Sequence, residues 1–269
     1  MKYEILRKIG SGSAGDGYLL KNGKARIVGK REDSFSTYKA LCEKMQILGD
    51  SITEVKYPKI YELISPCEEY PYGALIEEYI EGKELREEVE KLSTQQKEEI
   101  GKVLAKFVSQ IHNIKTTDRK KEEIEINLSK LNKGLSIVKD YLPTEVYEKL
   151  LAIKEPYKNL LESKNFCLTH GDLNAGNIMI DTNGRVSGVI DFGNMEYYIP
   201  EIEFVHMCFF DDVIYDSMVK NYPKDISKKE IIFLELVVNI RHFKNIKDFA
   251  DRRDNCLNNI KALLKAYLD

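Results

Sequence analysis

Two patterns of apolar and polar positions divide this chain near residue 80. Before that point, short apolar segments are separated by turn residues, a pattern typical of β-strands. Segment 36–48 is an exception, because its apolar residues recur three and four positions apart and therefore predict a helix. Helical spacing dominates from Gly82 onward. The chain is thus expected to combine a small antiparallel sheet and one helix with a mainly helical second region.

Capping signals and apolar stripes locate the helices of the second region. Segments Ser93–Gln96 and Ser227–Glu230 have the spacing of a capping box. Further helices are expected between residues 130 and 161 and over about 254–268. Behind the first capping box, one helix face carries an apolar stripe made of Ile100, Val103, Leu104, Phe107, Val108 and Ile111.

One β-hairpin is expected within the helical region. The dipeptide Asn183–Gly184 is a strong signal for a two-residue turn, and apolar segments 178–180 and 186–190 flank it. Such a turn pairs Thr182 with Arg185 and fixes the register of the whole hairpin.

The open end of this hairpin gathers three polar side chains. In that register Asn177 lies opposite Ile190, one position from Asp191, and Asp172 stands on the loop that leads into the hairpin. An amide oxygen and a carboxylate are suitable Mg²⁺ ligands, and a second carboxylate beside them can orient a hydroxyl group. The hairpin therefore predicts a site for phosphoryl transfer.

Composition and charge narrow the class of protein. The 269 residues are 43% hydrophobic and 32% charged, which is typical of a globular protein. A net charge of −3 gives no electrostatic case for nucleic-acid binding, and no apolar run has the length of a membrane-spanning helix. The first residues lack the apolar core of a signal peptide. The five cysteines show no CxxC pairing, so free thiols in the cytoplasm are expected and a zinc site is not.

A glycine-rich loop follows the first expected strand. Its GxGxxG spacing, at Gly10, Gly12 and Gly15, also occurs in dinucleotide-binding folds, where a helix opens at once and an acidic residue follows about twenty positions on. Here a strand, the turn signal Asn22–Gly23 and another strand follow instead. A glycine loop inside a hairpin can fold over phosphates and present backbone N–H groups to them. An ordinary flexible hairpin is the alternative.

The third strand ends in a lysine that could serve the same phosphates. Glu43 stands in the following helix and could pair with Lys30, leaving the lysine within reach of a nucleotide. Glu32 is a competing partner, and a lone lysine at a strand end is usually solvated.

Segment 74–82 is a strand that leads into the helical region. It has the character of a crossing between two lobes. Backbone groups around Glu78 and Ile80 could bond the edge of a purine; an ordinary edge strand is the alternative.

Together these motifs resemble the kinase fold, and within it the aminoglycoside phosphotransferase and choline kinase superfamily. The distinctive marker is HGDLNAGN at 170–177 followed by VIDFG at 189–193. The glycine loop, lysine, helix glutamate and strand crossing precede it in the same order, so the resemblance covers nearly the whole chain. The implied fold is α+β and bilobal, with a nucleotide-binding lobe and hinge in residues 1–80. A helical lobe in residues 81–269 would carry the catalytic hairpin and the acceptor site.

The resemblance also implies roles for individual residues. Asp172 would orient or deprotonate the acceptor hydroxyl, and Asn177 and Asp191 would hold Mg²⁺ ions on the phosphates of ATP or GTP. His170 would support the loop without taking part in the chemistry. The implied nucleotide-binding residues are Gly10, Gly12, Gly15, Lys30, Glu43, Glu78 and Ile80.

Two positions depart from the family pattern. Glu77 stands just before the hinge, where the family commonly has an apolar residue, and this could alter purine selectivity. The family usually places an aspartate after the metal-binding motif to brace the catalytic loop. Here Glu203 is expected to be a longer substitute.

Several features favour a small acceptor over a protein substrate. Protein kinases usually carry an arginine before the catalytic aspartate, where this chain has Gly171. Only residues 194–199 separate Gly193 from Pro200, and no APE motif follows. An activation segment that docks a peptide has no room in so short a connection.

The expected acceptor site lies between the catalytic loop and the helices after Asp191. Acidic residues there could hold a polycationic aminoglycoside, or could simply be solvated. The acidic candidates are Asp211, Asp212, Asp216 and Glu235. Aromatic residues could instead form a wall for a choline-like ammonium group, or belong to the core. The aromatic candidates are Tyr197, Tyr198, Phe209 and Phe210.

The expected function is therefore Mg²⁺-dependent transfer of the γ-phosphate of a nucleoside triphosphate to a hydroxyl of an aminoglycoside-type antibiotic. No nucleic acid, membrane or obligate protein partner is expected. A metabolic kinase of the same fold, for choline, a sugar or an amino alcohol, is the main alternative. A protein kinase and a non-catalytic nucleotide-binding module are further alternatives. A non-catalytic module would be expected to have lost some of the catalytic residues. This chain retains Lys30, Asp172, Asn177 and Asp191.

Overall fold

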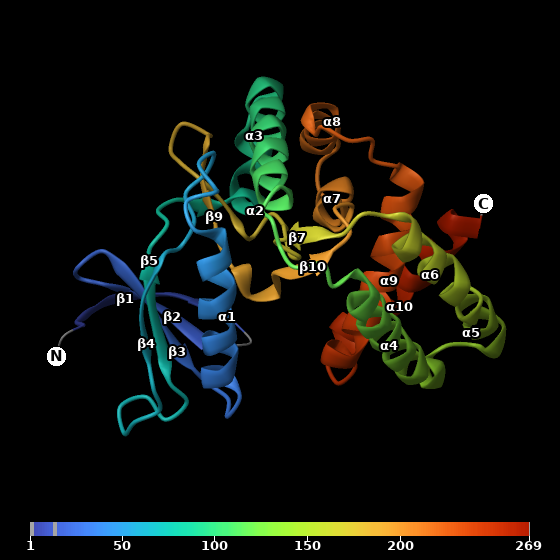
Figure 1. Ribbon diagram of the computed structural model, residues 1–269, viewed down its shortest axis with the longest axis horizontal. Coiled ribbons are helices and arrows are strands. Elements are labelled where there is room, and N and C mark those ends of the chain that lie inside the picture. Colours follow the sequence, from blue (N-terminus) through green and yellow to red (C-terminus); the bar gives the residue numbers. More distant parts are fainter. Residues whose placement is uncertain (1–2, 13–14, 269) are drawn as a thin grey trace.

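An antiparallel sheet of five strands forms the N-terminal part of the chain in the computed structural model, which describes residues 3–12 and 15–268 (Figure 1). Met1 and Lys2, and Ser13 and Ala14 of the expected glycine loop, lie outside the described residues. The strands lie in the order β1-β2-β3-β5-β4. Their bounds are β1 Ile5–Ser11, β2 Gly15–Leu20, β3 Lys24–Gly29, β4 Ile60–Ile64 and β5 Ala74–Glu78.

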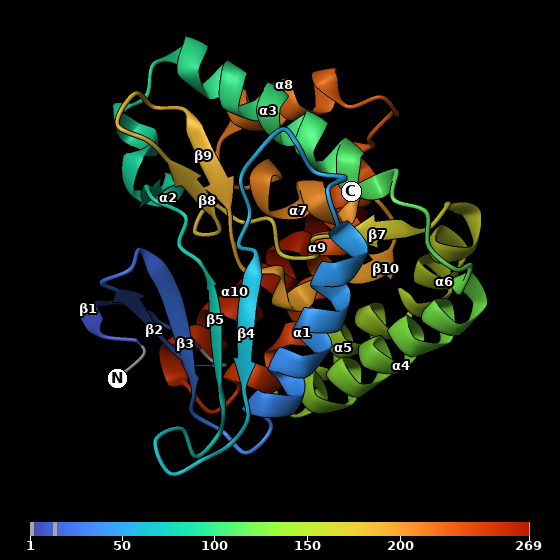
Figure 2. The ribbon, with the colours of Figure 1, turned by 60° about the vertical axis from the view of Figure 1, so that its left-hand side comes forward.

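The expected turn and helix of this part are both present. Gly23 has a φ of +80° and donates its N–H to the Leu20 carbonyl at 3.0 Å, which closes the turn between β2 and β3. Helix α1 (Ser34–Leu48) lies along the sheet on its side toward the helical region (Figure 2). Its buried Tyr38 reaches β2, since a Cβ on Gly15 would stand 2.4 Å from the tyrosine hydroxyl oxygen.

Helices make up most of the remaining chain, together with short strands. The helices are α2 Leu85–Glu88, α3 Thr94–His112, α4 Lys120–Val138, α5 Thr144–Leu151, α6 Lys154–Ser163, α7 Ile202–Cys208, α8 Asp212–Asn221, α9 Lys228–Ile246 and α10 Ala250–Leu268. Strands β6 (Lys83–Glu84), β8 (Ile178–Ile180) and β9 (Val186–Val189) form one small sheet, and β7 (Cys167–Thr169) pairs with β10 (Glu196–Tyr198). The α+β architecture expected from the sequence is confirmed.

The capping signals have the expected effect at the helix starts. Ser93 accepts a hydrogen bond from the Gln96 N–H, and the Gln96 side chain accepts one from the Ser93 N–H. Ser227 accepts the N–H of Glu230 at the start of α9. These bonds satisfy N–H groups that the first helical turn leaves without partners.

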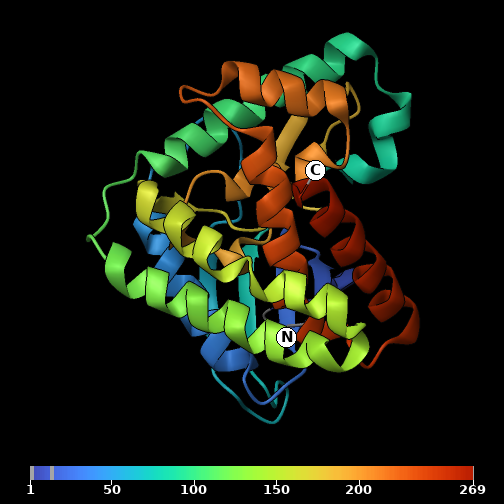
Figure 3. The ribbon, with the colours of Figure 1, turned by 90° about the vertical axis from the view of Figure 1, so that its right-hand side faces the viewer.

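Close packing of α3 against α8 and of α4 against α9 forms the core of the helical part. The stripe predicted on α3 is buried at Ile100, Leu104, Phe107, Val108 and Ile111. Figure 3 shows α4, α5 and α6, in green and yellow-green, grouped on one side of this part. Within the described residues, no helix is long and apolar enough to span a membrane.

Replacing Gly101 by alanine should test the α3–α8 contact. A Cβ on Gly101 would stand 2.4 Å from the Ile214 backbone oxygen of α8, so the two helices must separate. We expect Gly101→Ala to lower the free energy of unfolding by about 2 kcal/mol, despite the better helix propensity of alanine. Urea unfolding measures this change. Gly10→Ala is the control, because a Cβ there meets no atom within 4 Å; equal stability of both variants would contradict the prediction.

Candidate active site

The turn of the catalytic hairpin differs from the expected two-residue turn. Asp181, not Thr182, pairs with Arg185: the Asp181 N–H donates to the Arg185 carbonyl at 2.9 Å. The loop therefore contains three residues, and it ends in Gly184 with a φ of +76°. The Asp181 carboxylate holds the turn by accepting the N–H groups of Asn183 and Arg185.

A register shift in the strands restores the pairing expected at the open end. Ile180 pairs with Val186 next to the turn, and Met179 pairs with Gly188, so one residue of β9 is bulged out. Beyond the bulge, the Ile190 N–H donates to the Asn177 carbonyl at 2.8 Å. Asn177 thus lies opposite Ile190, as the two-residue turn had predicted, because the longer loop and the bulge compensate each other.

Three side chains surround the carboxylate of Asp172. Asn174 Nδ2 donates to Oδ1 at 2.8 Å, and Asn194 Nδ2 donates to Oδ2 at 3.2 Å. His206 Nε2 lies 3.5 Å from Oδ1. Asn177 Nδ2 donates to the backbone carbonyl of Asp172 at 2.8 Å, which ties the loop to the hairpin. The carboxylate is therefore held in one orientation at the junction of the loop and helix α7.

Glu203 braces the catalytic loop, as the sequence had suggested. Its Oε1 accepts the backbone N–H groups of His170 and Gly171, the second at 3.4 Å. Burial raises the pKa of Glu203 to about 8. Gly171 has a φ of +77°, and a Cβ there would stand 2.4 Å from the Asn194 backbone oxygen. Glycine therefore suits this position, where protein kinases carry arginine, on steric grounds.

His170 is a buried support of the loop. Its ring packs against Phe107 and Phe192. Burial lowers its pKa to about 4, so the ring is neutral near pH 7. In the tautomer that satisfies both contacts, Nε2 donates to the Ile190 carbonyl at 3.1 Å and Nδ1 accepts the Asp172 N–H at 3.3 Å.

Three carboxyl groups lie near one another between the sheet and the catalytic loop. Asp191 has a left-handed backbone with φ 65° and ψ 64°. Desolvation, followed by the negative charge of Asp172, raises the pKa of Asp191. Desolvation and the charge of Asp191 raise the pKa of Glu77 to about 7. Mutual repulsion of this kind is relieved by a bound cation.

Asn177 and Asp191 fit a magnesium site. Because Asn177 uses its Nδ2 in the bond to Asp172, its Oδ1 is left as an oxygen ligand beside Asp191. No cluster of three or more His, Cys, Asp or Glu side chains suited to a metal occurs within residues 3–12 and 15–268. A metal here would therefore depend on an amide oxygen and on oxygens from a bound phosphate.

The structure does not form the expected ion pair between Lys30 and Glu43. Lys30 Nζ lies 2.8 Å from Asp16 Oδ1 and donates to Ser11 Oγ at 2.6 Å. Hydrogen bonds to its carboxylate from Lys30, Lys8 and Ser11 lower the pKa of Asp16. Glu43 is exposed on α1. Asp16, on the neighbouring strand, replaces the helix glutamate as the partner, and Lys30 thereby stands beside the glycine loop.

Part of the backbone of segment 74–82 is hydrogen-bonded within the sheet. The Glu78 N–H donates to the Lys59 carbonyl at 2.9 Å, so this group is not open to a purine. Ile80 is buried, and its side chain approaches Gly188 of β9. Gly12 donates its N–H to the Gly15 carbonyl across the glycine loop. Nucleotide binding by these residues stays a prediction.

The four acidic acceptor candidates are not gathered around Asp172. Asp211 caps α8 by accepting the Ile214 N–H and pairs with Lys97 at 2.8 Å. Asp216 faces a surface depression between α3 and α8 that contains no residue of the catalytic loop.

The remaining two candidates, Asp212 and Glu235, lie on α8 and α9. Asp212 is exposed at the first position of α8. Glu235 accepts a hydrogen bond from Asn239 one turn along α9, and burial raises its pKa to about 7. Acceptor binding by these four residues stays a prediction.

The aromatic candidates are divided between core and surface. Tyr198 is fully buried, and its hydroxyl shares a hydrogen bond with Tyr157 at 2.5 Å. Tyr197 and Phe210 pack partly buried against the core, whereas the Phe209 side chain is 54% exposed. Tyr198 is thus a core residue and cannot line a site for an ammonium group.

A different set of charged residues lies near the segment after Asp191. Lys44 of α1 donates to the Gly193 carbonyl at 3.4 Å. Glu196 of β10 pairs with Lys130 of α4 at 2.9 Å and lies 3.9 Å from Arg241 of α9. Burial lowers the pKa of Lys44, and the charges of Glu196 and Lys130 also act on it. These four side chains come from separate elements, so no local motif could have revealed them.

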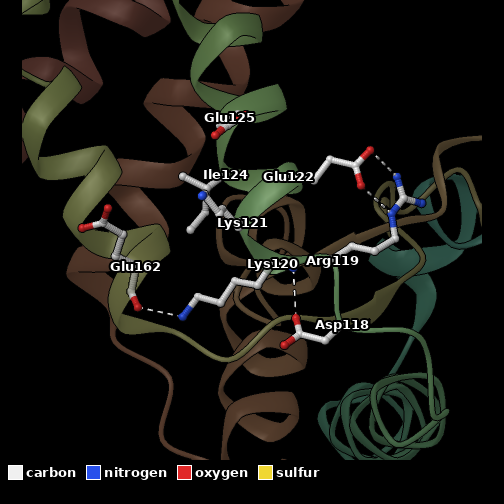
Figure 4. Close-up of a pocket in the computed structure, with 8 residues that line it drawn as sticks. All are labelled: Asp118, Arg119, Lys120, Lys121, Glu122, Ile124, Glu125 and Glu162. Carbon is white, nitrogen blue, oxygen red and sulfur yellow. Dashed lines mark hydrogen bonds and ion pairs between the residues drawn. The ribbon is translucent and has the colours of Figure 1, made fainter.

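A second surface depression lies where α4 begins, away from the catalytic loop (Figure 4). Its side chains are charged and satisfy one another: Lys120 donates to the Glu162 carbonyl at 2.7 Å, and Arg119 pairs with Glu122 at 3.0 Å. No residue predicted for the site lines it, so it adds nothing to the catalytic arrangement.

Comparison with known proteins agrees with this geometry. Residues 5–224 match the model of the phosphotransferase enzyme family. The structure of aminoglycoside phosphotransferase APH(2'')-IIa in complex with gentamicin superposes with a TM-score of 0.76 at 22% identity, covering 98% of this chain and 92% of the other. The ADP-bound structure of APH(2'')-Ib gives 0.73, also at 22% identity, over 98% and 93%. At these identities the similarity establishes the fold.

One relative is named for an acceptor other than an aminoglycoside. Mouse (Mus musculus) hydroxylysine kinase is 30% identical over 146 residues, which are 48% of this chain. The chain spans only 38% of the length of that protein.

The fold and the loop around Asp172 define a kinase-like phosphotransferase. The match over residues 5–224 shows that the chain belongs to the phosphotransferase enzyme family. The family is one of enzymes that transfer phosphate groups.

Stability should depend on pH through Glu203. The folded protein keeps a proton on Glu203 up to about pH 8, whereas the unfolded chain releases it near the ordinary glutamate pKa. This contribution is therefore present at low pH and is lost as pH rises toward about 8. We expect wild type to lose about 2 kcal/mol more than Glu203→Gln between pH 5.5 and 8.5. Urea unfolding at both pH values measures this, with the exposed Glu155→Gln as control; parallel slopes for wild type and Glu203→Gln would refute it.

Proposed function

We propose that the enzyme transfers the γ-phosphate of ATP or GTP, with Mg²⁺, to a hydroxyl group of a small amine-bearing acceptor. The observation that carries this proposal is the Asp172 carboxylate, which three side chains hold beside the amide of Asn177 and the carboxylate of Asp191. Orientation and charge neutralisation are the main requirements of phosphoryl transfer, and this arrangement supplies both.

Asn177 and Asp191 would hold the metal. When bound, Mg²⁺ would neutralise the charge that develops on the transferred phosphate. Lys30 stands beside the glycine loop, where it can exchange Asp16 for a phosphate oxygen. Glycines 10, 12 and 15 allow backbone N–H groups of that loop to approach a triphosphate closely.

Asp172 orients the acceptor hydroxyl. An ionised carboxylate attracts the hydroxyl proton and thereby directs an oxygen lone pair at the γ-phosphorus atom. The proton moves to Asp172 as the new O–P bond forms and the bond to the β-phosphate oxygen breaks, so Asp172 need not be a strong base. Its fixed geometry matters more than its proton affinity.

An aminoglycoside-type antibiotic is the first candidate for the acceptor. The family and the superposition on aminoglycoside phosphotransferases over nearly the whole chain support it. The acidic residues first expected to bind such a polycation stay candidates, and Glu196 is a further carboxylate on the segment after Asp191.

A hydroxylated amino acid is the second candidate. Its support is the identity with hydroxylysine kinase and the mixed charge around Glu196. Lys44 reaches this region, and none of the ion pairs found in the described part of the chain includes it. A carboxylate on the acceptor could therefore bind Lys44, while an ammonium group binds Glu196.

Removing the charge of Asp172 should stop catalysis without unfolding the protein. We expect Asp172→Asn to lower kcat by about 10³-fold, since the amide attracts no proton, with little change in the nucleotide KM. A coupled assay of nucleotide turnover over a panel of aminoglycosides, amino alcohols and hydroxylated amino acids measures this. Asp140→Asn, in an exposed 3-10 helix, is the matched control. Unchanged turnover in Asp172→Asn would exclude the mechanism; stimulation by none of the acceptors would exclude the proposed substrates.

Lys44 should separate the two acceptor candidates. If the acceptor carries a carboxylate, Lys44→Ala should raise the acceptor KM by about 10-fold or more through loss of a charge-assisted bond, with kcat nearly unchanged. If the acceptor is an aminoglycoside, its KM should stay constant or fall. Lys39→Ala, on the exposed face of the same helix, is the control. A raised KM in both variants would show a general electrostatic effect and would contradict a specific contact.

A further inference from the structure

His206 lies next to the carboxylate of Asp172. It stands on α7, three positions after Glu203, which binds the backbone of the same catalytic loop. Its Nε2 lies 3.5 Å from Asp172 Oδ1, and its side chain is about one-third exposed. Helix α7 thus contacts the loop twice. Glu203 binds the backbone of the loop, and His206 approaches the side chain of Asp172.

The surroundings of His206 favour a neutral ring. Asp172 and the neutral His170 face it from the catalytic loop, and His242 faces it from α9. Burial lowers the pKa of His206 more than the Asp172 carboxylate raises it. The ring is therefore uncharged near pH 7, and a neutral imidazole can donate one N–H group.

We propose that His206 is a positioning residue, whose neutral ring donates Nε2–H to Asp172 Oδ1 and whose protonation disables the site. This inference deepens the function proposed above, because it concerns the same carboxylate. The donated hydrogen bond fixes Oδ1, which Asn174 also contacts, and leaves the carboxylate turned toward the acceptor through the remaining lone pairs.

Protonation changes this contact from a neutral hydrogen bond to an ion pair. A charged ring beside Asp172 holds the carboxylate more tightly and reduces its attraction for the hydroxyl proton of the acceptor. Activity should therefore fall on the acid side as His206 becomes charged.

A titration without any acceptor tests the contact itself. The chain has four histidines, and burial keeps His112 and His170 neutral above about pH 5. NMR titration therefore needs to separate only His206 from His242, which the His242→Gln variant achieves. In Asp172→Asn the pKa of His206 should fall by about half a unit or more, because a nearby negative charge is lost. No change in the pKa of His206 would overturn the proposal.

Kinetics test what the contact does. Glutamine can place an N–H near the position of Nε2 but does not titrate, so His206→Gln should keep kcat within about threefold at pH 8 and move the acid limb to lower pH. His206→Ala should lose about tenfold in kcat at pH 8 with the nucleotide KM unchanged. His242→Gln is the control and should keep kcat at pH 8; because the charge of His242 lowers the pKa of His206, its loss should move the acid limb only to higher pH, opposite to His206→Gln.

The outcomes separate this inference from the proposed function. Equal losses in the glutamine and alanine variants, or an acid limb unmoved in His206→Gln, would overturn the positioning role. Far-UV circular dichroism of both variants excludes misfolding as the cause. If no acceptor supports turnover, the proposed substrates fail, while the titration of His206 still decides whether the pair exists.

Discussion

The active site depends on one contact between a helix and a loop. The buried Glu203 carboxylate accepts backbone N–H groups at His170 and Gly171, and so fixes the loop that carries Asp172. Burial of this group is costly: it raises the pKa to about 8, so that the group keeps its proton, and hydrogen bonds from two backbone donors offset part of the cost. The same helix presents His206 to the catalytic carboxylate. Helix α7 therefore sets both the path of the loop and the orientation of its catalytic group.

Negative charge is concentrated beside this loop, at Asp172, Asp191 and Glu77. Desolvation, followed by the charge of Asp172, raises the pKa of Asp191, and desolvation, followed by the charge of Asp191, raises that of Glu77. Such repulsion opposes folding, so its presence at one place in the molecule points to a function that uses it. A cation with a polyphosphate supplies the missing positive charge and oxygen ligands. The instability of the free site and its affinity for a metal-bound nucleotide then have the same electrostatic origin.

The architecture was well predicted from the sequence, because it depends on local signals. Turn dipeptides, capping boxes and the 170–177 motif each act within a few residues. The hairpin register came out right although its turn did not, since a bulge in β9 compensated for the longer loop. The partner of Lys30 was wrong for a related reason. Asp16 lies across the β2–β3 hairpin from it, where Gly15 pairs with Gly29, so the contact follows from the hairpin register and not from the pairing of a strand lysine with a helix glutamate.

Acceptor recognition shows where prediction from one sequence ends. An acidic residue in a helix can cap that helix, as Asp211 does, or pair within it, and the sequence does not distinguish these uses from ligand binding. The charged groups that do approach the catalytic segment come from α1, β10, α4 and α9. Tertiary packing alone brings them together. Substrate choice in such an enzyme can therefore change through single substitutions on distant elements, while the loop around Asp172 and its brace from Glu203 stay the same.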